Sequence, residues 1–221
     1  MRQKKIHYIY NDAMECMDFD ERKKLQGERL RATVELEYNN VPAYRKRMDE
    51  AGVKPEDINE IEDIVKLPFT QKTDLRDNFP YGLFAADLKD IVRIQGSSGT
   101  TGKPIVSGYT ENDIKVWTEM VARAFRCAGA GEDDIIQIAY GYGLFTGGLG
   151  AHQGATEVGA MVVPMSSGNT QRQITMMKEL GATMLCCTPS YATYLAETIH
   201  EMGIKPDFSF NSSGLIPISW M

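Results

Sequence analysis

Residues 1–90 carry apolar side chains at helical spacing among many charged ones. The apolar positions recur every three or four residues, which places them on one face of an α-helix: Leu30, Val34, Tyr38 and Val41. Pro42 lacks the amide hydrogen that a continuing helix needs, so this helix is predicted to stop there. A second, short helix is expected to end at Gly52. Residues 1–90 are therefore predicted to form a helical N-terminal region that acts as a scaffold or an interface.

From about Ile91 to Gly203 the pattern changes to short apolar runs that alternate with amphipathic segments. The apolar runs are typical of buried strands: IVRIQ (91–95), IVSGY (105–109), DIIQIAY (134–140), AMVVP (160–164) and ATMLCC (182–187). Strands separated by helices form right-handed βαβ units and a parallel sheet. The predicted fold class is therefore α/β, a mainly parallel sheet with flanking helices. Ligands of such sheets bind outside the carboxyl ends of the strands.

Three helices are expected in this part of the chain, two between these strands and one after the last of them. The first should present one apolar face, formed by Ile114, Trp117, Val121 and Phe125. It is expected to start at Thr110, with Asp113 in a capping-box-like pattern, and to stop at Gly129. The second helix is expected to start at Thr170 with Gln173, and the third to start at Thr188 and Pro189 and to stop at Gly203.

The segment GSSGTTGKP at residues 96–104 has the composition of an anion-binding loop. Its glycines let backbone amides approach a ligand, its hydroxyl side chains donate hydrogen bonds, and Lys103 adds a cation. A Walker A loop, G-x-x-x-x-G-K-[ST], is disfavoured because Ser97 stands at its first glycine and Pro104 at its last position. The segment also precedes a predicted strand, whereas a Walker A loop precedes a helix. A flexible surface linker is the remaining alternative.

The run SSGTTGKP resembles the phosphate loop of the adenylate-forming superfamily, which includes acyl-CoA synthetases, luciferases and the adenylation domains of peptide synthetases. The resemblance implies that the loop wraps the β- and γ-phosphates of ATP, with Lys103 as a catalytic, charge-assisted donor. The implied ATP-binding residues are Ser97, Ser98, Gly99, Thr100, Thr101, Gly102 and Lys103. The α/β sheet would then be part of the large domain of an adenylate-forming enzyme.

A second glycine-rich run, YGYGLFTGGLG at residues 140–150, follows one of the predicted strands. Its backbone can approach a flat ligand closely, and its aromatic rings can stack on one. A tight turn with buried aromatic residues would have the same composition.

This run continues through GAHQGATEVGAMVVPMSSGNTQRQI to TPSYATYLAE, and the whole is similar to phenylacetate–coenzyme A ligases. The resemblance extends from about residue 18 to about residue 207. It implies that Tyr140 and Phe145 contact an aryl ring and that Gly147 and Gly148 bring backbone close to it. Gln153 stands where an aromatic residue is more usual in that family.

The resemblance also implies a two-step ligation of an aryl acid to coenzyme A. The carboxylate attacks the α-phosphate of ATP, which is accompanied by Mg²⁺, to give an acyl-adenylate and pyrophosphate. The thiolate of coenzyme A then displaces AMP.

The expected organisation is a helical region at 1–90, a nucleotide- and acid-binding subdomain at 91–207, and a tail at 208–221 that does not match the family. The family's segments for magnesium, ribose and the α-phosphate are not found in these 221 residues, so a truncated N-terminal part is expected. The alternative is a non-catalytic remnant that binds a nucleotide or dimerises.

Composition excludes several other classes. The chain is 43% hydrophobic and 24% charged with a formal net charge of -6, which does not suit a nucleic-acid-binding surface. No apolar stretch approaches the ~18 residues of a membrane helix, and no signal-peptide pattern is present, so a cytoplasmic location is expected. A homodimer is a candidate assembly.

The reactive side chains form no metal-binding or nucleophile motif. The four cysteines lack C-x-x-C spacing, so reduced thiols are expected, and Cys186 and Cys187 should point to opposite faces of a strand. No set of histidine, cysteine and acidic residues has metal-ligand spacing, and His152 is expected to be structural.

Overall fold

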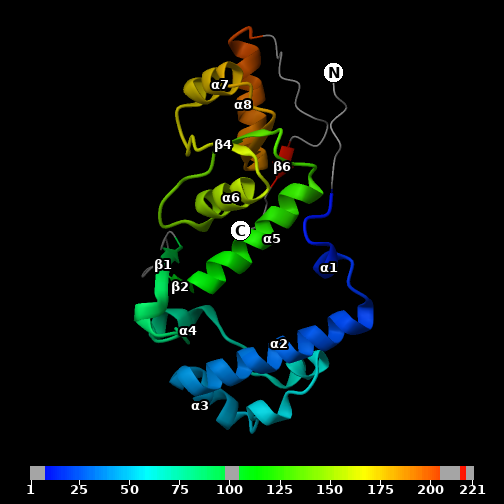
Figure 1. The fold of residues 1–221 in the computed structure, drawn as a ribbon. Coiled ribbons are helices and arrows are strands. Elements are labelled where there is room, and N and C mark those ends of the chain that lie inside the picture. Colours follow the sequence, from blue (N-terminus) through cyan, green and yellow to red (C-terminus); the bar gives the residue numbers. More distant parts are fainter. Residues whose placement is uncertain (1–7, 98–104, 205–214, 218–221) are drawn as a thin grey trace. The chain divides into compact units, whose positions relative to one another are not determined.

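The computed structural model describes residues 8–97, 105–204 and 215–217. The chain divides into two compact units: Asp12–Asn112, and a second unit that joins Met1–Asn11 to Asp113–Met221. Figure 1 labels elements of both units, and each unit has its own buried core.

The unit at residues 12–112 is mainly helical. Its helices are α1 (Asp12–Glu15), α2 (Phe19–Asn40), α3 (Pro42–Glu50), η1 (Pro55–Asp57), η2 (Ile61–Lys66), α4 (Lys72–Asp77) and η3 (Leu88–Asp90). Val34, Met48 and Ile58 form its buried core, and Leu30 and Tyr38 pack against them. The predicted helix with its apolar face is confirmed, and Pro42 both ends α2 and occupies the first position of α3.

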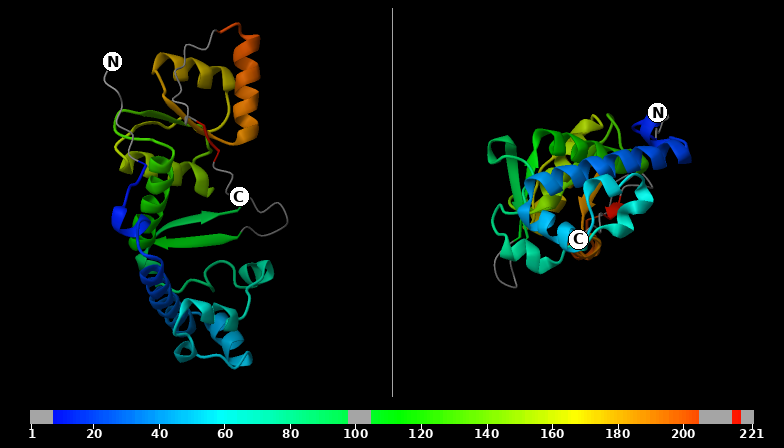
Figure 2. Two further views of the ribbon diagram at one scale, coloured as in Figure 1. Left: turned by 90° about the vertical axis from the view of Figure 1, so that its right-hand side faces the viewer. Right: turned by 90° about the horizontal axis from the view of Figure 1, so that it is seen from below.

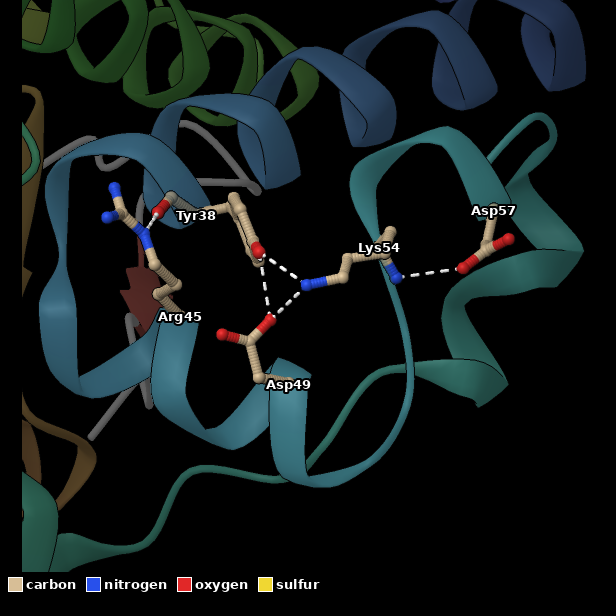
Figure 3. Close-up of polar contacts among 5 residues, drawn as sticks. All are labelled: Tyr38, Arg45, Asp49, Lys54 and Asp57. Carbon is tan, nitrogen blue, oxygen red and sulfur yellow. Dashed lines mark hydrogen bonds and ion pairs between the residues drawn. The ribbon is translucent and has the colours of Figure 1, made fainter.

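A polar cluster on this unit ties α2 to α3 and to the turn that follows (Figure 3). The Tyr38 hydroxyl donates to Asp49 Oδ1 (2.8 Å) and accepts from Lys54 Nζ (2.7 Å), and Lys54 also pairs with Asp49. The Lys54 ammonium holds the pKa of the Asp49 carboxyl below its usual value. Arg45 Nε donates to the Tyr38 carbonyl (2.7 Å), and the Lys54 amide donates to Asp57 (2.8 Å). The cluster therefore links α2, α3 and the following turn beside the apolar core, against which Tyr38 packs.

The same unit ends in a hairpin of two strands, β1 (Ile91–Gly96) and β2 (Val106–Thr110). They pair antiparallel, with Gly96 opposite Val106, and form a sheet of their own (Figure 2). The prediction that the parallel sheet begins at Ile91 is therefore wrong. Parallel neighbours need a crossover of roughly a dozen residues or more, and the connection at 97–105 is too short to provide one.

The second unit contains the predicted parallel sheet. Its strands are β3 (Ile135–Ile138), β4 (Met161–Val163), β5 (Met184–Cys187) and β6 (Leu215–Pro217), in the order β4-β3-β5-β6 and all parallel. Helix α5 (Glu111–Cys127) precedes β3, and α6 (Thr146–Glu157), α7 (Thr170–Glu179) and α8 (Pro189–Glu201) follow β3, β4 and β5 in turn. The mainly parallel α/β class with flanking helices is confirmed.

Helices cover both faces of this sheet (Figure 1). On one face Ile136, Ile138 and Cys186 pack against side chains of α5 and α6, including Phe125 and Ala151. On the other face Leu185 and Cys187 pack against α7 and α8, at Ile174, Met177 and Leu195. Cys186 and Cys187 therefore point to opposite faces as predicted, and all four cysteines are free.

Most of the predicted helix ends are found. Thr188 caps α8 by accepting from the Tyr191 amide, and Gly129 and Gly203 adopt the left-handed conformation that follows a helix. The predicted capping box of α7 is wrong. Asn169 is the N-cap residue, and its side chain accepts from the Arg172 amide.

Candidate functional site

The hairpin brings the two ends of the predicted phosphate loop together. The Ser97 amide donates to the Ile105 carbonyl (2.9 Å), and the Ile105 amide donates back to Ser97 Oγ (3.2 Å). Ser97 is exposed at the end of this stem. The other predicted ATP-binding residues, Ser98, Gly99, Thr100, Thr101, Gly102 and Lys103, lie outside the described residues.

The hairpin is held to its own unit by an aromatic contact on Gly108 of β2. A Cβ atom at this position would lie 2.4 Å from Cε2 of Phe84, closer than real side chains approach one another. The Phe84 ring in turn packs on Tyr81, with 5.4 Å between the ring centroids. Gly108 therefore allows the ring to lie directly against the strand that leads out of the predicted loop.

The second glycine-rich run is a loop only in its first half. Residues 139–145 follow β3, and α6 begins at Thr146, so Gly147 and Gly148 lie in the first turn of a helix. A Cβ on Gly148 would lie 2.5 Å from the Gly141 carbonyl oxygen. The glycine is therefore needed for the helix start to pack on the loop. Its predicted contact with an aryl ring stays a prediction.

The two aromatic residues predicted to contact the ring have different surroundings. Tyr140 is 8% exposed and belongs to the core between the sheet, α5 and α6. Phe145 is 43% exposed and is the residue that precedes α6. Their predicted role as ring contacts is neither supported nor opposed by this placement.

Tyr142 and His152 form a pair that the sequence did not predict. The Tyr142 hydroxyl lies 3.3 Å from His152 Nδ1, and the two rings meet edge to face at 85°. Burial raises the pKa of Tyr142 to about 12. The pair joins the loop after β3 to the middle of α6. The ten-residue separation of its members corresponds to no regular spacing, which is why the pattern does not predict it.

The loop after β4, residues 164–169, lies next to the start of the glycine-rich run. The Ser166 amide donates to the Ile138 carbonyl (3.2 Å), and Ser166 Oγ accepts from the Tyr142 amide (3.4 Å). Ser166, Gly168 and Asn169 all have positive φ, at 64°, 91° and 43°. The sequence patterns do not predict a site at this loop, although the run SSGN (166–169) is rich in turn-forming residues.

Both loops stand at the carboxyl ends of the parallel strands. The helix after β3, α6, packs on one face of the sheet, and the helix after its neighbour β4, α7, packs on the other. Open α/β sheets bind their ligands at such a reversal, outside the strand ends. The loops at 139–145 and 164–169 are therefore the candidate acid-binding part of this unit.

Neither a metal-binding cluster nor a membrane-spanning helix is found within the described ranges. No group of three or more histidine, cysteine or acidic side chains in 8–97, 105–204 and 215–217 could hold a metal ion. The chain as described contains no helix with the length and apolarity to cross a membrane.

Comparison with solved structures defines the class of protein. The fold matches 2-hydroxyisobutyryl-CoA ligase in complex with 2-HIB-AMP and CoA in the thioesterification state, with a TM-score of 0.86 and 27% identity. The match covers 95% of this chain and 46% of that chain. An open conformation of the same ligase matches with a TM-score of 0.85 and 26% identity, over 95% of this chain and 47% of that one. The fold is that of the adenylate-forming CoA ligases.

Sequence comparison gives a more particular result. The chain is 49% identical over 195 residues to phenylacetate-coenzyme A ligase of Pseudomonas putida, which covers 88% of this chain and 44% of that protein. The corresponding enzyme of Escherichia coli (strain K12) is 50% identical over 190 residues, covering 86% and 44%. The Thermus thermophilus enzyme is 47% identical over 199 residues, covering 90% and 45%.

No protein-family model matches the chain. The resemblance to phenylacetate–coenzyme A ligases that the sequence predicts is nevertheless confirmed by these relatives. The chain spans somewhat less than half the length of the curated relatives that it matches.

Proposed function

We propose that this chain belongs to an ATP-dependent enzyme that ligates an aryl carboxylic acid, such as phenylacetate, to coenzyme A through an acyl-adenylate. The observation that carries the proposal is the identity of 47–50% to phenylacetate–coenzyme A ligases over most of the chain. The likeness to a CoA ligase whose complex contains an acyl-AMP and CoA supports the adenylate route.

In this proposal the hairpin of β1 and β2 presents the phosphate loop. Residues 97–103 bind the β- and γ-phosphates of ATP through backbone amides and hydroxyls, and Lys103 is a charge-assisted donor. Mg²⁺ accompanies the nucleotide, since magnesium in such sites is bound largely through substrate phosphates. The closed stem at Ser97 and Ile105 supports this assignment because it fixes where the loop leaves and re-enters the sheet.

The acid is proposed to bind at the loop after β3. Tyr140 and Phe145 contact its ring, while Gly147 and Gly148 bring the backbone of α6 close to it. The carboxylate attacks the α-phosphate, pyrophosphate leaves, and the thiolate of coenzyme A displaces AMP from the carbonyl carbon. Catalysis of this kind depends on positioning and on stabilising developing charge. The enzyme is proposed to act in the cytoplasm, as a homodimer.

The test measures AMP release from ATP, magnesium, phenylacetate and coenzyme A by the natural protein that contains this sequence. Acid-dependent release that Lys103→Ala slows by roughly ten- to a hundredfold and Lys89→Ala leaves unchanged supports the proposal. Lys89 is a matched control, because it is an exposed lysine that precedes β1 and pairs only with exposed Asp87 in the described residues. ATP binding without AMP release from any aryl acid would instead favour a non-catalytic nucleotide-binding remnant. Absence of both would contradict both functions.

A further inference from the structure

Two glutamine side chains are completely buried inside the second unit. Gln137 lies within β3, and Gln173 lies in the first turn of α7. Both side chains are 0% exposed. Gln137 Nε2 donates to Gln173 Oε1 (2.7 Å) and to the Gln173 carbonyl (3.1 Å). Gln137 Oε1 is buried and accepts no hydrogen bond from the described part of the chain. Two apolar side chains at these positions would avoid the cost of burying an amide oxygen without a hydrogen bond. Packing alone therefore does not explain why glutamines stand here.

The second glutamine extends the contact into the loop after β4. Gln173 Nε2 donates to the Ser166 carbonyl (2.6 Å) and lies 3.5 Å from the Gly168 carbonyl. Ser166 in turn uses its other two polar groups on the end of β3 and on the Tyr142 amide. A continuous series of hydrogen bonds therefore runs from the centre of the sheet, through α7, to the glycine-rich loop.

The loop that receives these bonds has an unfavourable backbone conformation. Ser166 and Asn169 are not glycines, yet their φ angles are 64° and 43°. Asparagine visits this left-handed region readily, but serine does so rarely, and non-glycine residues held in sparsely populated regions gather at ligand sites. The loop also lies against the glycine-rich run, since a Cβ on Gly141 would be 3.5 Å from Ser167 Oγ.

We propose that Gln137 and Gln173 are positioning residues, which hold loop 164–169 against the glycine-rich loop and so set the geometry of the acid site. This inference rests on the proposed function. The glutamines touch neither substrate nor nucleotide in this proposal. They act through Ser166 and Tyr142 on the segment that receives the aryl acid, and so they govern the affinity for the acid and not that for ATP.

The test compares Gln173→Met with Gln171→Met in the natural protein that contains this sequence. Methionine has the length of glutamine but no amide, and Gln171 is an exposed residue of the same helix, so the second variant controls for the substitution. For Gln173→Met we expect the KM for phenylacetate to rise by about tenfold, with kcat and the KM for ATP near wild type. Loss of binding that is uniform in ground and transition states changes KM in this way.

Hydrogen exchange provides a readout that does not depend on activity. The amides of Ser166 and Tyr142 should exchange faster in Gln173→Met than in Gln171→Met, while the amides of β3 and β5 keep their protection. This measurement still decides the positioning role if the wild-type protein shows no acid-dependent turnover, an outcome that would count against the proposed function alone.

Several results would overturn the inference. They are unchanged exchange at Ser166 and Tyr142, an equal loss of affinity for acid and for ATP, or the same effect in Gln171→Met. If Gln173→Met fails to fold, the double variant Gln137→Met with Gln173→Met removes both amides together and leaves no half of the pair buried alone. That variant should fold and show the same rise in the KM for phenylacetate, and a wild-type KM in it would equally refute the positioning role.

Discussion

The contact between α5 and α6 depends on Gly154, and Gly154→Ala tests how closely the two helices approach. A Cβ at this position would lie 2.5 Å from Val121 Cγ1, 2.7 Å from its Cβ and 2.9 Å from its backbone carbon. Two of these three atoms belong to the backbone or are bonded to it directly. A change of the Val121 rotamer would therefore not relieve the overlap, and the helices themselves would have to move apart.

Two opposing effects determine the magnitude. Alanine is favoured over glycine within a helix by about 1 kcal/mol, which on its own would stabilise the variant. Overpacking of a close-packed core typically costs about 1–3 kcal/mol. Because backbone atoms take part in the overlap, we expect a cost at the upper end. The free energy of unfolding should therefore fall by about 2 kcal/mol, once the gain in helix propensity is subtracted.

The assay is urea denaturation followed by circular dichroism, with Thr156→Ala as the control. Thr156 is exposed on the same helix, so its substitution should change the free energy of unfolding by no more than about 0.5 kcal/mol. Gly150→Ala is a second check. The Cβ of the new alanine would lie 2.5 Å from the Trp117 ring, so the substitution should alter the fluorescence of the Trp117 indole. A Gly154→Ala protein that is more stable than wild type would refute the close approach of the two helices.

Three other predictions concern nucleotide binding, the choice of carboxylic acid substrate, and the stability of the protein at low pH. Lys103→Ala should slow acid-dependent pyrophosphate exchange by a factor that corresponds to the loss of one charge-assisted hydrogen bond, about 1.5–3 kcal/mol, and an unchanged exchange rate would contradict the role of Lys103. In a panel of acids the natural protein should prefer phenylacetate to octanoate, because the aromatic side chains of Tyr140 and Phe145 can stack on a flat ring. The reverse order would contradict the aryl assignment. Lys66, with the Asn59 and Glu60 amides, lowers the pKa of Asp63 from 3.8 to about 2. The stabilising contribution of Asp63 is thus present above pH 3.8 and is lost as the pH falls through about 2. Asp63→Asn should therefore flatten the plot of unfolding free energy against pH in this range. A plot parallel to that of the wild type would argue against the role of Asp63.

Much of the fold follows from local patterns that can be read in the sequence. The apolar face of α2, the strands of the parallel sheet and the stops at Gly129 and Gly203 are confirmed, because each depends on spacing or on a conformation that one residue type favours. The strand at Ile91 was predicted correctly as an element and wrongly as a member of the sheet. Pairing direction depends on the connection and on tertiary contacts, which the apolar pattern does not contain.

The candidate site was less predictable, for reasons that concern tertiary packing. The glycines at the start of α6 predict a loop, since glycine disfavours helices, but the close contacts of Gly148 with the Gly141 carbonyl and of Gly150 with Trp117 make glycine necessary there. Gln173 was assigned to a capping box and instead lies buried with Gln137, a partner 36 residues away. The sequence indicated the chemistry of the loops, whereas the contacts that position them depend on residues distant in the chain.

The opposite orientations of Cys186 and Cys187 make two adjacent residues into separate reporters of local opening. Cys186 is covered by α5 and α6, and Cys187 by α7 and α8. Burial raises their pKa values to about 12 and 11, so neither thiol should alkylate until its covering layer detaches. After the exposed Cys16 and Cys127 have been blocked, a thiol reagent would therefore record which helical layer separates first, within a single peptide fragment.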